Sequence, residues 1–136
     1  MSRKHYVGLF GKQQRPERDP ESFLPLTTAT LHILLALGAE ERHGYGIIKE
    51  VSKTSEGKIT LGPGTLYRSL PELLEDGLIE ESTRRPNKEE DQRRRYYRLT
   101  SLGRTVLGLE TRRLANIVAL ARAQKVLQRS SVREGT

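Results

Sequence analysis

The segment from Leu61 to Gly103 constrains the fold most, because helix-starting and helix-ending residues divide it into short elements. It reads LGPGTLYRSLPELLEDGLIEESTRRPNKEEDQRRRYYRLTSLG. Pro63 favours the start of a helix, since a first-turn proline has no amide hydrogen to leave unpaired. Gly77 suits the left-handed residue that closes a helix. The leucines between them share one helical face, which we expect to be buried: Leu66, Leu70, Leu73 and Leu74. Pro71 falls inside this helix, and we expect a kink or a break near Leu70.

Two strands and a charged loop follow this helix. Ile79 to Thr83 and Arg95 to Leu99 fit strands, the second with Tyr97 and Leu99 facing inward. The proline, asparagine and dense charge between them predict a loop. Thr100 is then expected to cap a last helix over residues 101–128. This order is typical of a winged helix-turn-helix, a mainly α fold with a small β-hairpin wing, here followed by a long C-terminal helix.

Two further helices are expected before Leu61. Thr27 or Thr28 can cap the first, whose apolar residues at helical spacing are Leu31, Leu34 and Leu35. The second lies within AEERHGYGIIKEVSKT and ends before Gly57, and its apolar side comprises Ile47, Ile48 and Val51.

The chain therefore divides into four parts. Residues 1–23 form a basic, flexible extension, either a solvated tail or an arm that grips DNA or a second subunit. Residues 24–100 form the winged-helix domain, residues 101–128 the dimerisation helix and residues 129–136 a tail.

Composition narrows the class of partner. The chain has 136 residues, with 24 basic against 17 acidic residues and a net charge of +7, which favours a polyanion. A membrane surface is disfavoured because no long apolar run or lipidation signal occurs. Cysteine is absent, which excludes disulfides, thiolate metal sites and thiol nucleophiles. The N-terminus lacks a secretory signal, so we expect a cytoplasmic protein.

The remaining side chains do not suggest catalysis. His5, His32 and His43 share no metal-ligand spacing, and no carboxylate pair flanks a candidate nucleophile. We therefore expect no enzyme activity, no metal and no cofactor. A nuclease would need clustered acids and a metal ion.

The helix that starts at Pro63 is the candidate recognition helix. Its N-terminal half carries Thr65, Tyr67 and Arg68, where such helices contact base edges. Arg68 can bind guanine bidentately, and the Tyr67 hydroxyl can donate to a phosphate. The alternative is a half-buried Tyr67 beside a merely solvated Arg68.

The loop between the strands is the second candidate contact. Residues 84–98 contain seven basic and three acidic residues, and the planar arginine fork suits phosphate. The alternative is a solvated charged face, with the acidic residues pairing with their neighbours. The complete set of expected DNA-binding residues is Tyr45, Lys49, Lys58, Thr65, Tyr67, Arg68, Arg84, Arg85, Arg93 and Arg94.

The last helix is the candidate dimer interface. Its second half is apolar almost all round, which one docking surface cannot cover. The residues concerned are Leu114, Ile117, Val118, Leu120 and Ala121. A homodimer would present two recognition helices to half-sites about 34–36 Å apart. The alternative is a helix packed within its own domain. Gly103 and Gly108 weaken this helix but can permit close approach.

Four motifs in this sequence together resemble the PadR family of transcriptional regulators: ILLALGAEERHGYGI, LGPGTLYRSLPELLEDGLIEE, RRRYYRLTSLG and LANIVALARA. The resemblance covers about residues 24–127. It implies a dimeric repressor that binds double-stranded DNA. The chain is similar to the short subfamily, which has one C-terminal helix. The resemblance also implies that Tyr67 contacts DNA. Some short members stack a planar effector on a tryptophan, which this chain lacks. Whether a small-molecule effector binds this chain is left open. A non-specific architectural or protein-interaction role is the alternative to sequence-specific repression.

Overall fold

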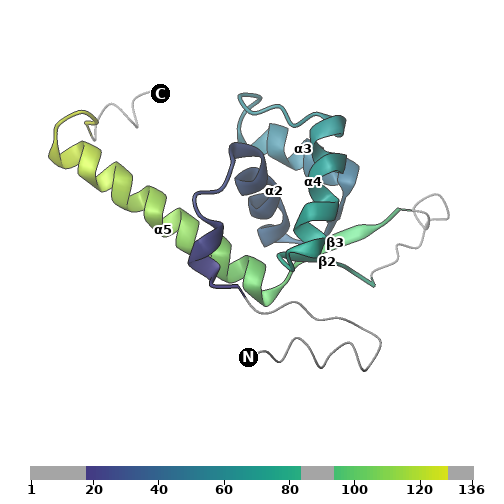
Figure 1. Ribbon diagram of the computed structural model, residues 1–136. Helices are drawn as coiled ribbons and strands as arrows, with labels where there is room; N and C mark the ends of the chain where they lie inside the picture. Colours follow the sequence, from purple (N-terminus) through teal and green to yellow (C-terminus); the bar gives the residue numbers. More distant parts are fainter. Residues whose placement is uncertain (1–17, 84–93, 129–136) are drawn as a thin grey trace, which may run out of the picture.

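The computed structural model describes residues 18–83 and 94–128 (Figure 1). The expected contacts at Arg84, Arg85 and Arg93, most of the N-terminal extension and the final tail lie outside these residues. The described elements follow in the order η2 (Pro20–Phe23), α2 (Thr28–Ala39), β1 (Arg42–His43), α3 (Gly44–Thr54), α4 (Pro63–Glu75), β2 (Ile79–Glu81), β3 (Tyr96–Leu99) and α5 (Ser101–Ala123).

Helices α2, α3 and α4 form a compact head, with the small sheet at one edge and α5 leading away from it (Figure 1). The predicted mainly α fold with a β wing is confirmed. One core joins the head, the sheet and the first turns of α5. Its most completely buried apolar side chains are Ile33, Leu34, Leu37, Ile47, Val51, Leu66, Leu78, Ile79 and Val106.

The sheet is antiparallel with β3 in the centre, in the order β1-β3-β2. Ile79 pairs with Leu99 across β2 and β3, and His43 pairs with Tyr96 across β1 and β3. The inward positions of Tyr97 and Leu99 were predicted correctly, but Tyr96 is buried as well. The His43 ring meets Tyr96 edge-on at 5.2 Å between centroids. Since the cross-strand neighbour His43 lies against Tyr96, alternation along β3 alone does not predict the burial of Tyr96.

Local capping residues set the ends of the elements as predicted. The Thr27 side chain accepts a hydrogen bond from the Thr30 amide at 3.1 Å, so it caps α2. Helix α4 starts at Pro63, and Gly77 follows it with a φ of 78°. The Thr100 hydroxyl accepts from the Gly103 amide at 2.9 Å and caps α5.

The expected face of α2 was partly wrong. Leu35 is 43% exposed, while the buried face is formed by Ile33, Leu34 and Leu37. The sequence TATLHILLALGA is apolar nearly all round, so helical periodicity could not select one face.

The expected break at Pro71 does not occur, because α4 continues to Glu75. Leu70 and Leu73 are both buried in the core, while Pro71 itself is exposed. An interior proline costs about 3 kcal/mol. Packing on both sides of the proline therefore outweighs the missing hydrogen bond.

Helix α5 is shorter than predicted and ends at Ala123 rather than near Gln128. Lys125 takes a φ of 62°, and the Val126 amide donates to the Ala121 carbonyl at 2.9 Å. The helix therefore ends in a left-handed turn at Lys125. The sequence did not predict this end, because the left-handed position is not occupied by the usual glycine.

The segment before α2 packs against α5. The Leu26 amide donates to Glu110 Oε2 at 3.1 Å, and Arg113 Nε donates to Glu110 Oε1 at 2.7 Å. The Glu110 side chain is 1% exposed, and the Arg113 guanidinium lowers the pKa of this carboxyl despite its burial. Residues 18–23, the last part of the predicted extension, also belong to the described fold, because Phe23 packs against the core and Arg18 lies 3.5 Å from Asp76. The contact between Leu26 and Glu110 ties the middle of α5 to the segment that leads into α2.

Gly103 allows α5 to start directly against the turn that precedes β2. A Cβ atom at Gly103 would overlap the carbonyl oxygen and carbon of Leu78. Gly108 has open space around its Cβ position, so the close approach expected of both glycines holds only for Gly103 within the described chain.

Candidate nucleic-acid interface

The N-terminal ends of α3 and α4 meet the start of β3 around one shallow depression of about 320 Å³. Three of the expected DNA-binding residues line it: Tyr45, Tyr67 and Arg94. The other residues in its lining are His43, Arg95 and Tyr97. Residues up to about 50 positions apart in the sequence therefore share one surface.

Tyr67 is held across the start of α3. Its side chain is 55% exposed, and its hydroxyl lies 2.5 Å from where a Cβ atom of Gly44 would be. Gly44 is buried at the first position of α3. The hydroxyl end of the ring therefore packs on the glycine, while more than half of the side chain remains exposed.

The other expected contacts on α3, α4 and the loop between them do not line this depression. Lys49 places its ammonium 5.5 Å from the centre of the Tyr45 ring, and Arg68 is exposed on α4. Thr65 is half-buried, and Lys58 is exposed in the loop between the two helices. The lining therefore includes only part of the residues that the sequence suggested for these helices.

Glutamates neutralise two of the arginines that the sequence assigned to the wing. Arg95 Nη1 lies 3.2 Å from Glu81 Oε2, and Arg98 Nε lies 2.8 Å from Glu80 Oε2. Glu41 also approaches Arg98, at 3.6 Å, and the bonded carboxylates raise the pKa of Arg98. The count of basic residues in the wing therefore overstates the charge available to a polyanion.

His43 joins the site, although in the sequence it was considered only as a metal ligand and had no suitable spacing. Its Nδ1 accepts a hydrogen bond from the Gly46 amide at 3.0 Å, which makes it the N-cap of α3. Its Nε2 lies 2.7 Å from Arg94 Nη1. The sequence signal was the place of His43 directly before the first turn of α3, where capping side chains are common.

Tyr97 supplies a hydroxyl at the edge of the depression. Burial raises the pKa of Tyr97, and the nearby Glu81 carboxylate raises it further. Its hydroxyl therefore keeps its proton at neutral pH and is available as a hydrogen-bond donor.

The acidic residues of α4 lie at its C-terminal end, away from the depression at its N-terminal end. Glu72 and Glu75 are exposed, and Asp76 Oδ1 lies 3.5 Å from Arg18 Nη1. Since α4 presents hydroxyl and basic groups at its N-terminal half and carboxylates at its C-terminal end, only the former suits phosphate.

A family model described as the transcriptional regulator PadR-like family matches residues 33–109, which include the head, the sheet and the start of α5. The chain belongs to the PadR-like family of transcriptional regulators. Comparison with curated proteins finds no significant match.

Solved structures of PadR-like regulators share the fold. A PadR family transcription regulator from Clostridium difficile is 22% identical, with a TM-score of 0.60, over 71% of this chain and 97% of that one. A PadR-like regulator from Bacillus cereus is 18% identical, with a TM-score of 0.59, over 79% and 96%. A PadR-like transcription factor from Bacteroides fragilis is 26% identical, with a TM-score of 0.56, over 69% and 86%.

In this PadR-like chain the second half of α5 extends beyond the head (Figure 1). Ile117, Val118 and Leu120 are 48%, 39% and 56% exposed, while Leu114 and Ala121 are half-buried. The described part of its own domain therefore leaves much of this apolar surface uncovered, as the pattern predicted.

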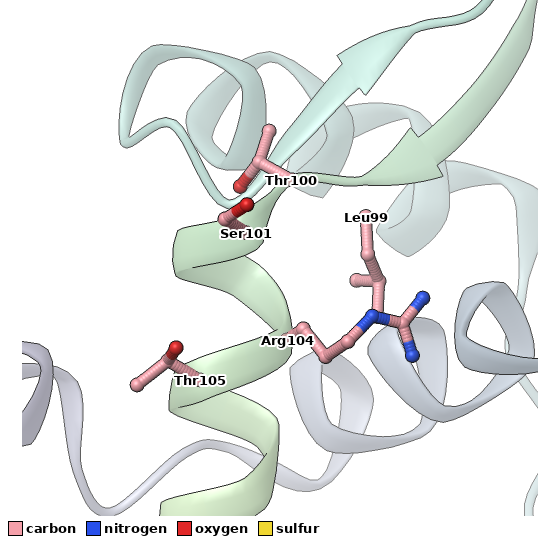
Figure 2. Close-up of a pocket in the computed structure, with 5 residues that line it drawn as sticks. All are labelled: Leu99, Thr100, Ser101, Arg104 and Thr105. Atoms are coloured by element: carbon pink, nitrogen blue, oxygen red, sulfur yellow. The ribbon is translucent and has the colours of Figure 1, made fainter.

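A second depression, of about 470 Å³, lies at the junction of β3 and α5 in the PadR-like fold (Figure 2). Its lining comprises Leu99, Thr100, Ser101, Arg104 and Thr105. The Thr100 hydroxyl donates to the Gly77 carbonyl at 2.5 Å and accepts from the Gly103 amide. Because this hydroxyl is used in both directions, its role here is to fix the corner between the wing and α5.

The residues that the structure describes offer neither a metal-binding group nor a membrane-spanning helix. Among them no group of three or more histidines and acids is placed to hold a metal ion. No helix in this part of the chain has the length and apolar character needed to cross a bilayer.

Proposed function

We propose that this PadR-like chain is a homodimeric, sequence-specific repressor that binds double-stranded DNA in the cytoplasm. The N-terminal half of α4 enters the major groove, where Arg68 reads a base edge and Thr65 supports it. Tyr45, Lys49, Lys58 and Tyr67 contact the backbone. The wing residues Arg84, Arg85, Arg93 and Arg94 follow the adjacent phosphates.

One observation carries this proposal. Tyr45 on α3, Tyr67 on α4 and Arg94 just before β3 line one depression beside the start of α4. Hydroxyl and guanidinium donors around a common opening suit the non-bridging oxygens of a phosphodiester. The net charge of +7 adds a favourable long-range field for a polyanion.

The dimer is proposed to form through α5. Leu114, Ile117, Val118, Leu120 and Ala121 would pack against the same residues of a second copy, giving a twofold interface. This arrangement is supported by three apolar side chains that lie within about one helical turn. Ile117, Val118 and Leu120 are 39–56% exposed.

An effector that releases the repressor would bind beside this interface. A groove of about 350 Å³ runs between the segment at Leu24 and α5, lined by Leu109, Arg112 and Asn116 among others. Its lining combines leucines with the charged groups Glu21 and Arg112, which suits a small ligand with an apolar body and a polar end.

The test is a fluorescence-anisotropy titration of genomic duplex fragments, with a mixed-sequence duplex as competitor. A sequence-specific repressor binds some fragments at least about a thousandfold more tightly than the mixed duplex. Arg68→Ala is expected to cost about 1–3 kcal/mol on those fragments and to relax base preference at one position. The matched control is Arg104→Ala, which removes the same charge from an exposed position on α5. Equal affinity for all duplexes would favour the architectural role instead.

A further inference from the structure

Arg42 joins three parts of the fold through one guanidinium group. Its Nε donates to the Ala36 carbonyl oxygen at 2.9 Å, in the last turn of α2. Its Nη1 lies 3.3 Å from Glu40 Oε2, and its Nη2 lies 3.5 Å from Glu50 Oε2 in α3. The Arg42 side chain is only 16% exposed. One planar group therefore ties the end of α2 to the turn that follows it and to the middle of α3.

This contact lies directly behind the candidate DNA-binding surface. Arg42 belongs to β1 and pairs with Tyr97 of β3, and the next residue, His43, is the N-cap of α3. Tyr97 and His43 both line the depression of about 320 Å³. Tyr45, the second residue of α3, lines it as well. A change in the tilt of α3 against β1 would therefore move Tyr45 relative to Tyr97.

Apolar packing does not set that tilt by itself. Ile47 and Val51 are buried in the core and determine which face of α3 points inward. Apolar contacts are not directional, whereas hydrogen bonds require a defined geometry. A polar group whose donors are satisfied also makes its surroundings more rigid. Arg42 supplies directional contacts of this kind between α3 and the end of α2.

The guanidinium of Arg42 is itself poorly placed to bind a phosphate. It is mostly buried, and the carboxylates of Glu40 and Glu50 lie beside it. Any influence of Arg42 on DNA binding must therefore pass through the residues that it holds in place.

We propose that Arg42 is a positioning residue for DNA binding, because it holds α3 against α2 and so places Tyr45 beside Tyr67 on the DNA-binding surface. This assignment rests on the function proposed above. It gives Glu50, an acidic residue, a favourable role in binding a polyanion, because Glu50 is one of the groups that hold Arg42.

Glu50→Gln gives the sharpest test, because charge and positioning predict opposite effects. Removal of a negative charge strengthens DNA binding if only the long-range field matters. If the ion pair positions α3, Glu50→Gln weakens binding of a mixed-sequence duplex about three- to tenfold, the worth of one hydrogen bond. Glu72→Gln, at an exposed position of α4, is the matched control and should bind as tightly as the wild type or more tightly. Binding by Glu50→Gln that is as tight as the wild type, or tighter, overturns the proposal.

Two substitutions of Arg42 separate positioning from direct contact with DNA. Arg42→Lys retains the charge but lacks the planar fork that reaches three acceptors, so we expect affinity to fall about three- to tenfold. Arg42→Gln removes the charge and should weaken binding without changing the slope of log K against log salt. A slope reduced by about one would indicate a direct phosphate contact and would contradict the positioning role. Titrations are made well below the melting temperature of every variant, so that unfolded protein does not contribute to the loss.

A measurement without DNA separates this inference from the proposed function. Tyrosine ring signals in ¹H–¹³C spectra of the free protein report the surroundings of Tyr45 and Tyr67. Arg42→Lys should shift these signals, while the ring signals of Phe23, which lies under the Arg18 guanidinium, should stay unchanged. If the wild-type chain binds no duplex, the proposed function fails. If the wild type binds and the signals of Tyr45 and Tyr67 are the same in Arg42→Lys, only the positioning role of Arg42 fails.

Discussion

The hydroxyl of Tyr67 occupies the space that a side chain at Gly44 would need. An ideal Cβ on Gly44 lies 2.5 Å from this hydroxyl oxygen and 3.0 Å from the ring carbon that carries it. The first residue of α3 and an exposed residue of α4 are thus matched in size. This match holds the Tyr67 ring at the edge of the candidate DNA-binding surface.

Gly44→Ala should therefore reorient Tyr67 without unfolding the head. The new methyl group meets the far end of a half-exposed side chain, which can swing into solvent. We expect stability to change by less than about 1 kcal/mol, while affinity for duplex DNA falls several-fold. Thermal melting and fluorescence anisotropy check the two effects. Gly46→Ala is the matched control, because its Cβ would make only ordinary contacts of 3.5 Å. Equal DNA affinity for both variants would contradict the role given to Tyr67.

Gly103→Ala should destabilise the whole domain. Its methyl group would overlap the Leu78 backbone, which cannot move aside as a side chain can. Overpacking of this kind costs about 1–3 kcal/mol or more. Gly108→Ala, in open space on the same helix, should stabilise by up to about 1 kcal/mol through helix propensity. Urea unfolding measures the free energy of unfolding of both variants. A Gly103→Ala variant as stable as the wild type would refute the close approach of α5 to Leu78.

Glu110 should make stability depend on pH in the acid range. Hydrogen bonds from Arg113 and the Leu26 amide lower the pKa of Glu110 below its ordinary value of 4.5. Because the folded-state pKa is the lower one, the stabilisation is complete above about pH 4.5. It is lost as the pH falls through the folded-state pKa.

Glu110→Gln isolates this effect, because it retains the shape of the side chain and removes the charge. At pH 7 we expect a loss of about 1–2 kcal/mol, since Arg113 is 39% exposed and its contribution is screened. The gap between wild type and variant in thermal melts should close as the pH falls below about 4.5. A gap that stayed constant down to pH 3 would exclude the charged contact.

Ile117→Glu and Leu120→Glu should separate the proposed dimer while leaving the head folded. Each places a charge on the exposed apolar part of α5, far from the core. We expect sedimentation to show monomers, with an unchanged circular dichroism spectrum and weaker DNA binding. Thr111→Glu, at an exposed polar position of α5, is the control. Wild-type protein that sediments as a monomer at micromolar concentration would refute the interface.

The sequence predicted best the features set by neighbouring residues. Pro63 at the start of α4, Gly77 after it and Thr100 before α5 act within one turn of the chain. Such signals need no knowledge of the rest of the fold, which is why the order of helices and strands could be read directly.

Features that depend on distant contacts were missed or wrong. The two-residue strand at Arg42–His43 exists because it pairs with Tyr96 and Tyr97, more than 50 positions later. The continuation of α4 through Pro71 depends on the burial of Leu70 and Leu73 in a shared core. The pairing of Arg98 with Glu80 depends on strand register and could not be counted from composition.

The candidate site was also predicted only in part from the sequence. Tyr67 and Arg94 were expected from their chemistry and lie together beside the start of α4. His43 was not expected, because its place beside Arg94 depends on β1 lying next to β3. The contacts at Arg84, Arg85 and Arg93 remain predictions from the sequence.

We propose that a dimer of this chain reads two half-sites on duplex DNA. Selection of bound fragments from a pool of random duplexes by the purified wild-type protein tests it most directly. We expect enrichment of an inverted repeat, with half-sites centred about 10 base pairs apart or a multiple of that spacing. A bound pool with no enriched sequence, or no retained DNA even in dilute buffer, would contradict it.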